Sequence, residues 1–120
     1  MNVIKIDVVK KEIYEIEMTT DFKEIYKHLD CDLFTCISSK TIAPGDTIYI
    51  DDEGLLREDP IGAFSIRGVS QVLSGHGLII GSDDQGDSIS CITPLDVIKQ
   101  LVRFEDLYYL PKPGFTIEVF

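Results

Sequence analysis

Apolar and polar residues alternate in two stretches near the start of the chain, and this alternation predicts an opening β-hairpin. The apolar positions are Ile4, Ile6 and Val8 in the first stretch and Tyr14, Ile16 and Met18 in the second. A period of two residues places each set on one face of a strand. We expect the chain to reverse at the charged step between the two stretches, over residues 9–12.

The period then changes and predicts a short amphipathic helix. Its apolar residues recur at helical intervals and are Phe22, Ile25, Tyr26 and Leu29. Residues 19–21 offer three N-cap candidates, and Glu24 follows Asp21 at the spacing of a capping box. A helix that begins near residue 21 and packs one apolar face is therefore expected after the hairpin.

Short runs of β-branched and apolar residues predict further strands. They cover residues 33–37, 47–50, 78–80 and 88–92. The turn residues 82–87 join the last two runs into a second hairpin. Residues 55–74 are interrupted by Pro60, Gly62 and Gly68, and we expect there a surface excursion with a short helical or extended piece.

A second helix is predicted from Thr93, the expected N-cap, with Pro94 at the first helical position. Its buried stripe is expected at Leu95, Ile98, Leu101 and Val102. We expect this helix to end near Phe104. Alternation over residues 115–119 predicts a terminal strand that pairs inside the sheet.

Together these elements predict an α+β fold. We expect a mixed, mostly antiparallel sheet of about five to seven strands with two helices packed on one face. The 120 residues suit a single domain, residues 1–120. No stretch reaches the length of a membrane span, and the first residues lack the apolar core of a secretory signal. We therefore expect a soluble protein.

The chain is strongly acidic. It has 11 Lys and Arg against 21 Asp and Glu, which gives a formal net charge of -10. This balance opposes contact with nucleic-acid phosphates, so we expect no direct DNA or RNA binding. The charge fits solubility, a basic protein partner or imitation of a polyanion, and charge alone does not separate these uses.

Three cysteines, Cys31, Cys36 and Cys91, show no paired metal-ligand spacing. We interpret them as free thiols in a reducing compartment rather than as a zinc site or a nucleophile. The sequence therefore predicts a cytoplasmic protein without a metal or a cofactor.

Two acidic loops hold the clearest candidate binding residues. These are Asp51, Asp52 and Gly54 in the first loop and Asp83, Asp84 and Asp87 in the second. Carboxylates around a glycine are typical of calcium loops, but no glutamate follows at the required offset, and tight hairpins use the same residues. We expect the loops to face a protein partner.

His76 and three arginines are the remaining candidates. His76 lies between two glycines, which favour a bulge or a turn and would leave its ring accessible for proton transfer. No motif places a nucleophile beside it, so we expect no catalytic residue. Arg57, Arg67 and Arg103 would bind a small anion if they converged.

Two blocks of the sequence resemble a known family. Residues 50–56 combine a strand with an acidic-glycine turn, and residues 78–87 combine a glycine-flanked apolar strand with an acidic Gly-Asp turn. In these blocks the chain resembles the family called domain of unknown function 3846. The resemblance covers most of the chain and implies a phage, plasmid or bacterial accessory-gene context, without an assigned reaction.

We predict a small, non-enzymatic binding or interaction module, and two alternatives stay open. One is a counter-defence protein that mimics nucleic acid or captures a small anionic signalling nucleotide. Mimicry predicts carboxylates spaced along one face, whereas capture predicts a basic pocket with several of the few arginines and lysines. The other is an obligate homo-oligomer, such as a homodimer, held by exposed apolar residues. Candidates for that contact are Tyr108, Tyr109, Leu110 and Phe120.

Overall fold

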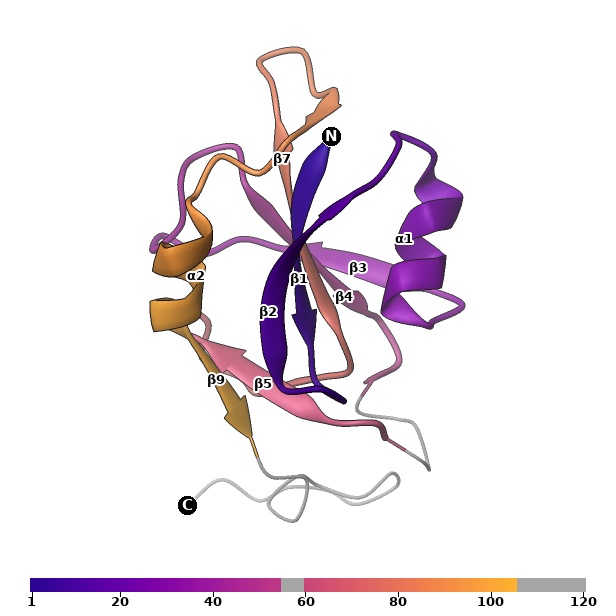
Figure 1. The fold of residues 1–120 in the computed structure, drawn as a ribbon, viewed down its shortest axis with the longest axis vertical. Coiled ribbons are helices and arrows are strands. Elements are labelled where there is room, and N and C mark those ends of the chain that lie inside the picture. The colour runs from indigo at the N-terminus through magenta and orange to yellow at the C-terminus, as the bar shows by residue number, and fades with distance from the viewer. Residues whose placement is uncertain (55–59, 106–120) are drawn as a thin grey trace.

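A main sheet of six strands forms the centre of the protein (Figure 1). The structure is a computed structural model that describes residues 1–54 and 60–105. The strands of this sheet are β1 (Asn2–Asp7), β2 (Glu12–Glu17), β3 (Phe34–Ile37), β4 (Thr47–Asp51), β7 (Gly77–Ser82) and β8 (Ser88–Ile89). They follow the order β2-β1-β7-β4-β3, with β8 paired to β7, and every pairing is antiparallel.

A second, smaller sheet and two helices complete the described fold. The small sheet has the order β6-β5-β9 and contains β5 (Ala63–Ile66), β6 (Leu73–Ser74) and β9 (Val102–Glu105). The helices are α1 (Phe22–Leu29) and α2 (Leu95–Leu101). The predicted α+β class and mostly antiparallel sheet are confirmed. Within the described residues, neither helix is long and apolar enough to cross a membrane.

The two helices lie on opposite faces of the main sheet, whereas the sequence led us to expect both on one face. Leu29 of α1 packs with Val3 and Leu78, and Ile98 of α2 packs with Ile4 and Ile79 on the other face. Figure 1 shows the sheet between the helices. The reason is that β7 buries consecutive residues on both of its faces, and each face needs an apolar cover.

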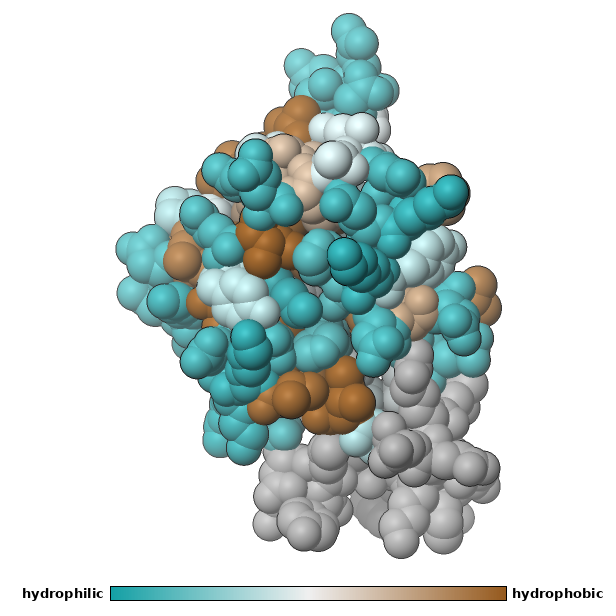
Figure 2. All heavy atoms as spheres, turned by 45° about the vertical axis from the view of Figure 1, so that its right-hand side comes forward, coloured by the Kyte–Doolittle hydropathy of each residue, from teal (hydrophilic) through white to brown (hydrophobic). Residues whose placement is uncertain are grey.

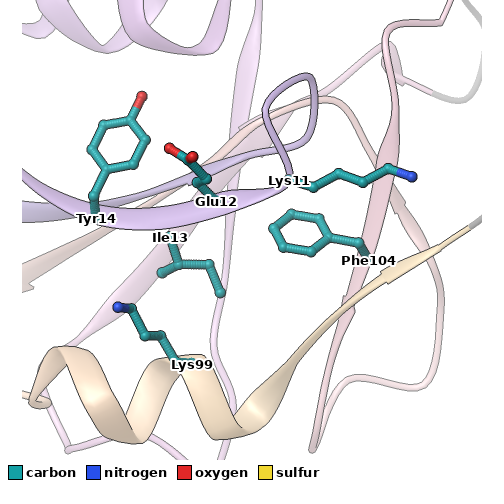
Figure 3. A pocket seen from close by; sticks show the side chains of 6 residues that line it. All are labelled: Lys11, Glu12, Ile13, Tyr14, Lys99 and Phe104. Atoms are coloured by element: carbon teal, nitrogen blue, oxygen red, sulfur yellow. The ribbon is translucent and has the colours of Figure 1, made fainter.

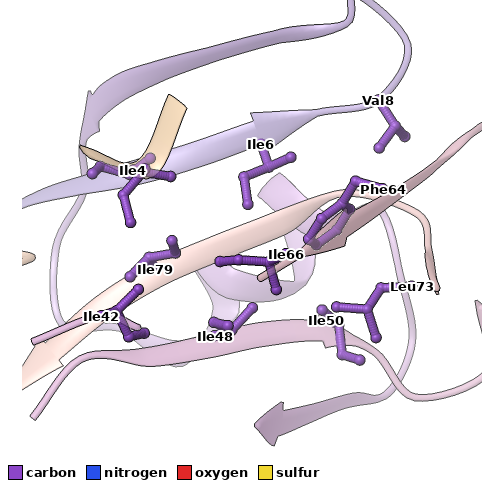
Figure 4. Close-up of a cluster of buried hydrophobic side chains, with 11 residues drawn as sticks. Ile4, Ile6, Val8, Ile42, Ile48, Ile50, Phe64, Ile66, Leu73 and Ile79 are labelled. Atoms are coloured by element: carbon purple, nitrogen blue, oxygen red, sulfur yellow. The ribbon is translucent and has the colours of Figure 1, made fainter. Parts of the chain in front are cut away.

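The larger core lies between the main sheet and the small sheet (Figure 4). Phe64 of β5 is fully buried there and lies against Gly77 of β7. A Cβ atom at position 77 would come within 2.7 Å of the Phe64 ring. Glycine at this position therefore lets the two sheets approach closely.

The predicted opening hairpin and first helix are confirmed. β1 and β2 pair from Asn2↔Glu17 to Asp7↔Glu12. The Asp21 carboxylate caps α1 by accepting a hydrogen bond from the Lys23 main-chain N–H at 3.0 Å. Glu24 reaches back to the main-chain N–H of Thr19, two residues before the cap, so the reciprocal bond of a capping box is displaced by two positions.

Within the described part of residues 55–74, the predicted short extended piece is present as β5, but it is buried and not part of a surface excursion. Residues 63–66 form β5, and three of its four residues are buried. The interrupting glycines lie outside the strand: Gly62 precedes it, and Gly68, with φ of +95°, makes the turn that follows. Residues 55–59 lie outside the described residues.

The second helix is shorter than predicted. It ends at Leu101, and residues 102–105 form β9, which pairs with β5. The register with β5 makes Val102 and Phe104 inward-facing strand residues, so long-range pairing overrides the local helical pattern. Thr93 does not cap the helix, because its hydroxyl donates to Asp46 at 2.5 Å. The predicted strand over 115–119 lies outside the described residues.

Candidate functional site

A hollow of about 370 Å³ lies where β5 meets α2 and β9. Figure 1 shows β5 and β9 side by side below α2. The polar residues that line the hollow are Ser65, Arg67, Gln100 and Arg103, and the apolar ones are Ile66, Val69, Leu101 and Val102. Strong cations, neutral hydrogen-bonding groups and apolar residues thus line one open depression, a combination that suits a small polar ligand.

The pairing of β5 with β9 brings Arg67 and Arg103 together. Ser65 lies opposite Arg103, and the Arg67 main-chain N–H donates to Leu101 O at 3.0 Å. Arg67 begins the turn after β5, and its bond to Leu101 continues the β5–β9 ladder by one position. The two arginines are therefore diagonal neighbours. Both side chains are exposed, and neither guanidinium has a hydrogen-bond or ion-pair partner among the described residues.

The main chain at Arg67 is held from the opposite side. Its carbonyl oxygen accepts hydrogen bonds from the Ser39 hydroxyl at 2.9 Å and the Thr41 hydroxyl at 2.6 Å. Gly68 follows with a positive φ, and a Cβ atom there would overlap Ser39 Oγ. These contacts hold the main chain from which the Arg67 side chain extends. No local sequence motif predicts that Ser39 and Thr41 hold the main chain at Arg67.

The first acidic loop follows β4 and borders a smaller hollow of about 170 Å³. Asp51 is buried, and its Oδ1 accepts a hydrogen bond from the Glu53 main-chain N–H at 2.9 Å. Asp52 is exposed. Gly54 is buried, and a Cβ atom at its position would overlap the carbonyl oxygen of Ser74. Much of this loop therefore serves the contact between β4 and β6.

The second acidic loop is the tip of the β7–β8 hairpin. Asp83 Oδ1 accepts hydrogen bonds from the main-chain N–H groups of Gln85 and Asp87, both at 2.9 Å. Asp83 thus stabilises the turn, and Asp83, Asp84 and Asp87 are all exposed. The tip projects from the body in Figure 1 and is hydrophilic in Figure 2.

The structure does not bring the two acidic loops together. β4 and β7 are antiparallel, with Ile50 opposite Gly77 and Thr47 opposite Ile80. The loop after β4 and the loop after β7 consequently lie at opposite ends of the sheet. Within residues 1–54 and 60–105, no three His, Cys, Asp or Glu side chains come together in a way that could hold a metal ion.

His76 is buried in a polar network and not accessible as the flanking glycines suggested. Its exposed fraction is 7%, and its Nδ1 accepts a hydrogen bond from the Val8 main-chain N–H at 3.2 Å. Asp7 Oδ1 is 3.6 Å from the same nitrogen. Because Nδ1 accepts a hydrogen bond it carries no proton, so this contact is not an ion pair in the neutral form. Asp7 Oδ2 accepts from the Tyr14 hydroxyl at 2.9 Å.

The network shifts the pKa values of all three side chains. Burial and the charge of Lys5 lower the pKa of His76, and the nearby carboxylates only partly oppose this. Burial alone would raise the pKa of Asp7, but the hydrogen bonds from Lys10 and Tyr14 outweigh it and hold this pKa low. Burial and the Asp7 carboxylate raise the pKa of Tyr14 to about 12. Near neutral pH the group is therefore a neutral imidazole, a carboxylate and a phenol.

A second buried network, which the sequence did not indicate, is centred on Asp46. Its two carboxylate oxygens accept hydrogen bonds from the main-chain N–H groups of Ile92 at 2.9 Å and Thr93 at 2.7 Å. The Thr93 hydroxyl adds a third bond to Asp46. Burial and Asp46 raise the pKa of the nearby Cys91 thiol to about 12, so Cys91 remains a thiol and is a poor nucleophile. None of the three cysteines forms a disulfide bond.

A third hollow, of about 440 Å³, lies between the edge strand β2 and the α2–β9 segment (Figure 3). In Figure 3, Ile13 points towards Lys99, and Lys11 lies beside Phe104. Glu12 and Tyr14 point to the other side of β2, and the Tyr14 hydroxyl is occupied by Asp7. In Figure 3 the ends of Lys11 and Lys99 point away from each other, so these two lysines do not share one anion at this hollow.

Of the eight residues predicted to bind, only Arg67 lines the hollow that Arg103 also lines. Asp51, Asp52 and Gly54 border another hollow, His76 is buried, and the other three form the hairpin tip. Arg57 lies outside the described residues. Ser65 and Gln100 were not predicted, because no motif marks them.

Comparison with known proteins identifies a family for this chain. No curated protein and no solved structure matches it. One family model matches residues 1–105, which include both hollows beside α2 and every described strand. The chain therefore belongs to the family described as Domain of unknown function (DUF3846).

Proposed function

We propose that this protein is a small binding module that takes up a low-molecular-weight anion in the hollow between β5, α2 and β9. One observation carries the proposal. Arg67 and Arg103 line the same hollow, and neither has an ion-pair partner among the described residues. They belong to a chain in which 21 acidic residues outnumber 11 basic ones.

The charges of the two arginines support this proposal. Two guanidinium groups on diagonal neighbours repel each other, and an anion between them would relieve that repulsion. Arginine is well suited to this task because its planar fork of N–H donors matches carboxylate and phosphate oxygens. Gln100 adds an amide at the same hollow.

The two acidic loops do not form one binding surface. Asp51 is turned into the contact with β6, and the hairpin tip lies at the other end of the sheet. A basic protein partner at the hairpin tip, nucleic-acid mimicry and a homodimer all stay predictions, as do the cytoplasmic location and the accessory-gene context. We propose no reaction, because buried His76 has its Nδ1 committed to the Val8 N–H.

Isothermal titration calorimetry with inorganic phosphate at low ionic strength tests the proposal. The natural protein should bind phosphate, and each of Arg67→Ala and Arg103→Ala should weaken binding about tenfold, because each removes a charge-assisted hydrogen-bond donor. The matched control is Lys23→Ala with Lys27→Ala, which removes two exposed positive charges from α1, away from the hollow.

The control variant should bind phosphate as the natural protein does. If it loses as much affinity as the Arg67→Ala, Arg103→Ala double variant, binding follows overall charge and the proposed site is wrong. Absence of phosphate binding to the natural protein at millimolar concentration would also contradict the proposal.

A further inference from the structure

We infer that the hollow selects a phosphate monoester that carries a compact apolar organic group. This inference rests on the proposed function and concerns which kind of anion binds there. Three features of the hollow carry it: the number of positive charges, a negative boundary on one side and the apolar wall.

The number of charges favours a dianion. Arg67 and Arg103 are the two cationic side chains among the residues that line the hollow. A phosphate monoester carries close to two negative charges near pH 7, so one such group neutralises both guanidiniums. A carboxylate, a sulfonate or a phosphate diester carries one charge and leaves half of the repulsion in place.

A carboxylate limits the ligand to one phosphate. Glu105 lies two residues after Arg103 on the same face of β9, and its Oε1 accepts a hydrogen bond from the Ser65 hydroxyl at 2.7 Å. This bond holds a negative charge beside Arg103, on the side away from Arg67. A second phosphate on that side would meet the Glu105 carboxylate, so the arrangement disfavours polyphosphates and nucleic acids.

The apolar wall of the hollow is formed by Val69 and Leu101, which are half-buried. Ile66 and Val102 also border the hollow, but their side chains face the core on the other face of the small sheet from Arg103. The volume of about 370 Å³ lies within the range of roughly 300–1,000 Å³ that is typical for organic ligands. An inorganic ion would leave this wall in contact with water, whereas an apolar ester group would cover it.

Calorimetry with three probes tests the inference: phenyl phosphate, inorganic phosphate and benzenesulfonate. Phenyl phosphate should bind at least about tenfold more tightly than either of the others, because only it has both the double charge and the apolar ring. A Val69→Thr variant changes the wall at nearly constant shape. It should narrow the advantage of phenyl phosphate over inorganic phosphate to about threefold.

The outcomes separate the two proposals. Equal affinities for phenyl phosphate and inorganic phosphate would overturn the apolar selection, and equal affinities for phenyl phosphate and benzenesulfonate would overturn the selection of a dianion. In both cases phosphate binding that depends on Arg67 and Arg103 would leave the proposed function intact. If none of the three probes binds, both proposals are wrong.

Discussion

The Nδ1 atom of His76 accepts a hydrogen bond from the Val8 main-chain N–H at 3.2 Å, and this bond exists only while Nδ1 carries no proton. Burial lowers the pKa of His76 in the folded state. An unfolded chain has an ordinary histidine pKa of about 6.5 and binds the proton more readily. The free energy of unfolding should therefore be highest above pH 6.5 and fall as the pH drops from there through the folded pKa.

Urea unfolding at pH 7.5 and pH 5.5 checks this pH dependence. In His76→Gln the side-chain oxygen can still accept from Val8, and the loss of stability between the two pH values should become smaller. The control is His28→Gln, because the pKa of His28 on α1 is also lowered by burial. His28→Gln should remove only the part of the pH-dependent loss of stability that comes from His28. If His76→Gln loses as much stability as the natural protein between these pH values, the account of His76 is wrong.

Asp46 should be among the most sensitive polar positions. Replacement by alanine leaves the Thr93 hydroxyl and the main-chain N–H groups of Ile92 and Thr93 without their acceptor. We expect Asp46→Ala to lower the free energy of unfolding by about 2–4 kcal/mol in urea denaturation. Exposed Asp52 is the matched control, and Asp52→Ala should change the free energy of unfolding by less than about 0.5 kcal/mol. Similar values for both variants would refute this role of Asp46.

The contact between Gly77 and Phe64 makes a second stability prediction. In Gly77→Ala the new methyl group meets the fully buried Phe64 ring at 2.7 Å, and overpacking of this kind costs about 1–3 kcal/mol. Adding Phe64→Leu should recover part of that loss, because the smaller side chain makes room. A double-mutant cycle by urea denaturation measures the coupling, and strictly additive effects would argue against the contact.

Thr41 should affect ligand affinity through the main chain of Arg67. Thr41→Val keeps the shape of the side chain and removes the 2.6 Å hydrogen bond to Arg67 O. We expect the affinity for phenyl phosphate to fall about threefold to tenfold, and the free energy of unfolding to fall by about 1 kcal/mol. Thr41→Ser keeps the hydroxyl and should restore most of the affinity. If Thr41→Val and Thr41→Ser bind phenyl phosphate equally, the hydroxyl does not position Arg67.

Local sequence signals were sufficient where neighbours in the chain are also neighbours in the fold. The β1–β2 hairpin and α1 follow from alternation, helical periodicity and the Asp21 cap, which all act over a few residues. The strand β7 was evident from its apolar run. The position and burial of β5 were not predicted, because it has only four residues between glycine-containing turns and its burial depends on Gly77 in a distant strand.

The candidate site could not be located from the sequence for the same physical reason. Arg67 and Arg103 are 36 positions apart (103 − 67), and they meet because β9 pairs with β5. The residues of β9 were predicted as the last turn of a helix, which would have turned Arg103 to another direction. The chemistry of arginine predicts that two of them bind an anion when they lie close together. Which arginines lie close together depends on the pairing of strands in the folded chain.

The most direct test of the central claim is to map phosphate binding by two-dimensional ¹H–¹⁵N NMR. Titration with phenyl phosphate should shift the main-chain signals of β5, β9 and the last turn of α2, and also the Arg67 and Arg103 side-chain signals. The signals of the hairpin tip at Asp84 and Asp87 should stay in place. Shifts that centre on another part of the protein, or no shifts at saturating phenyl phosphate, would contradict the proposed binding site.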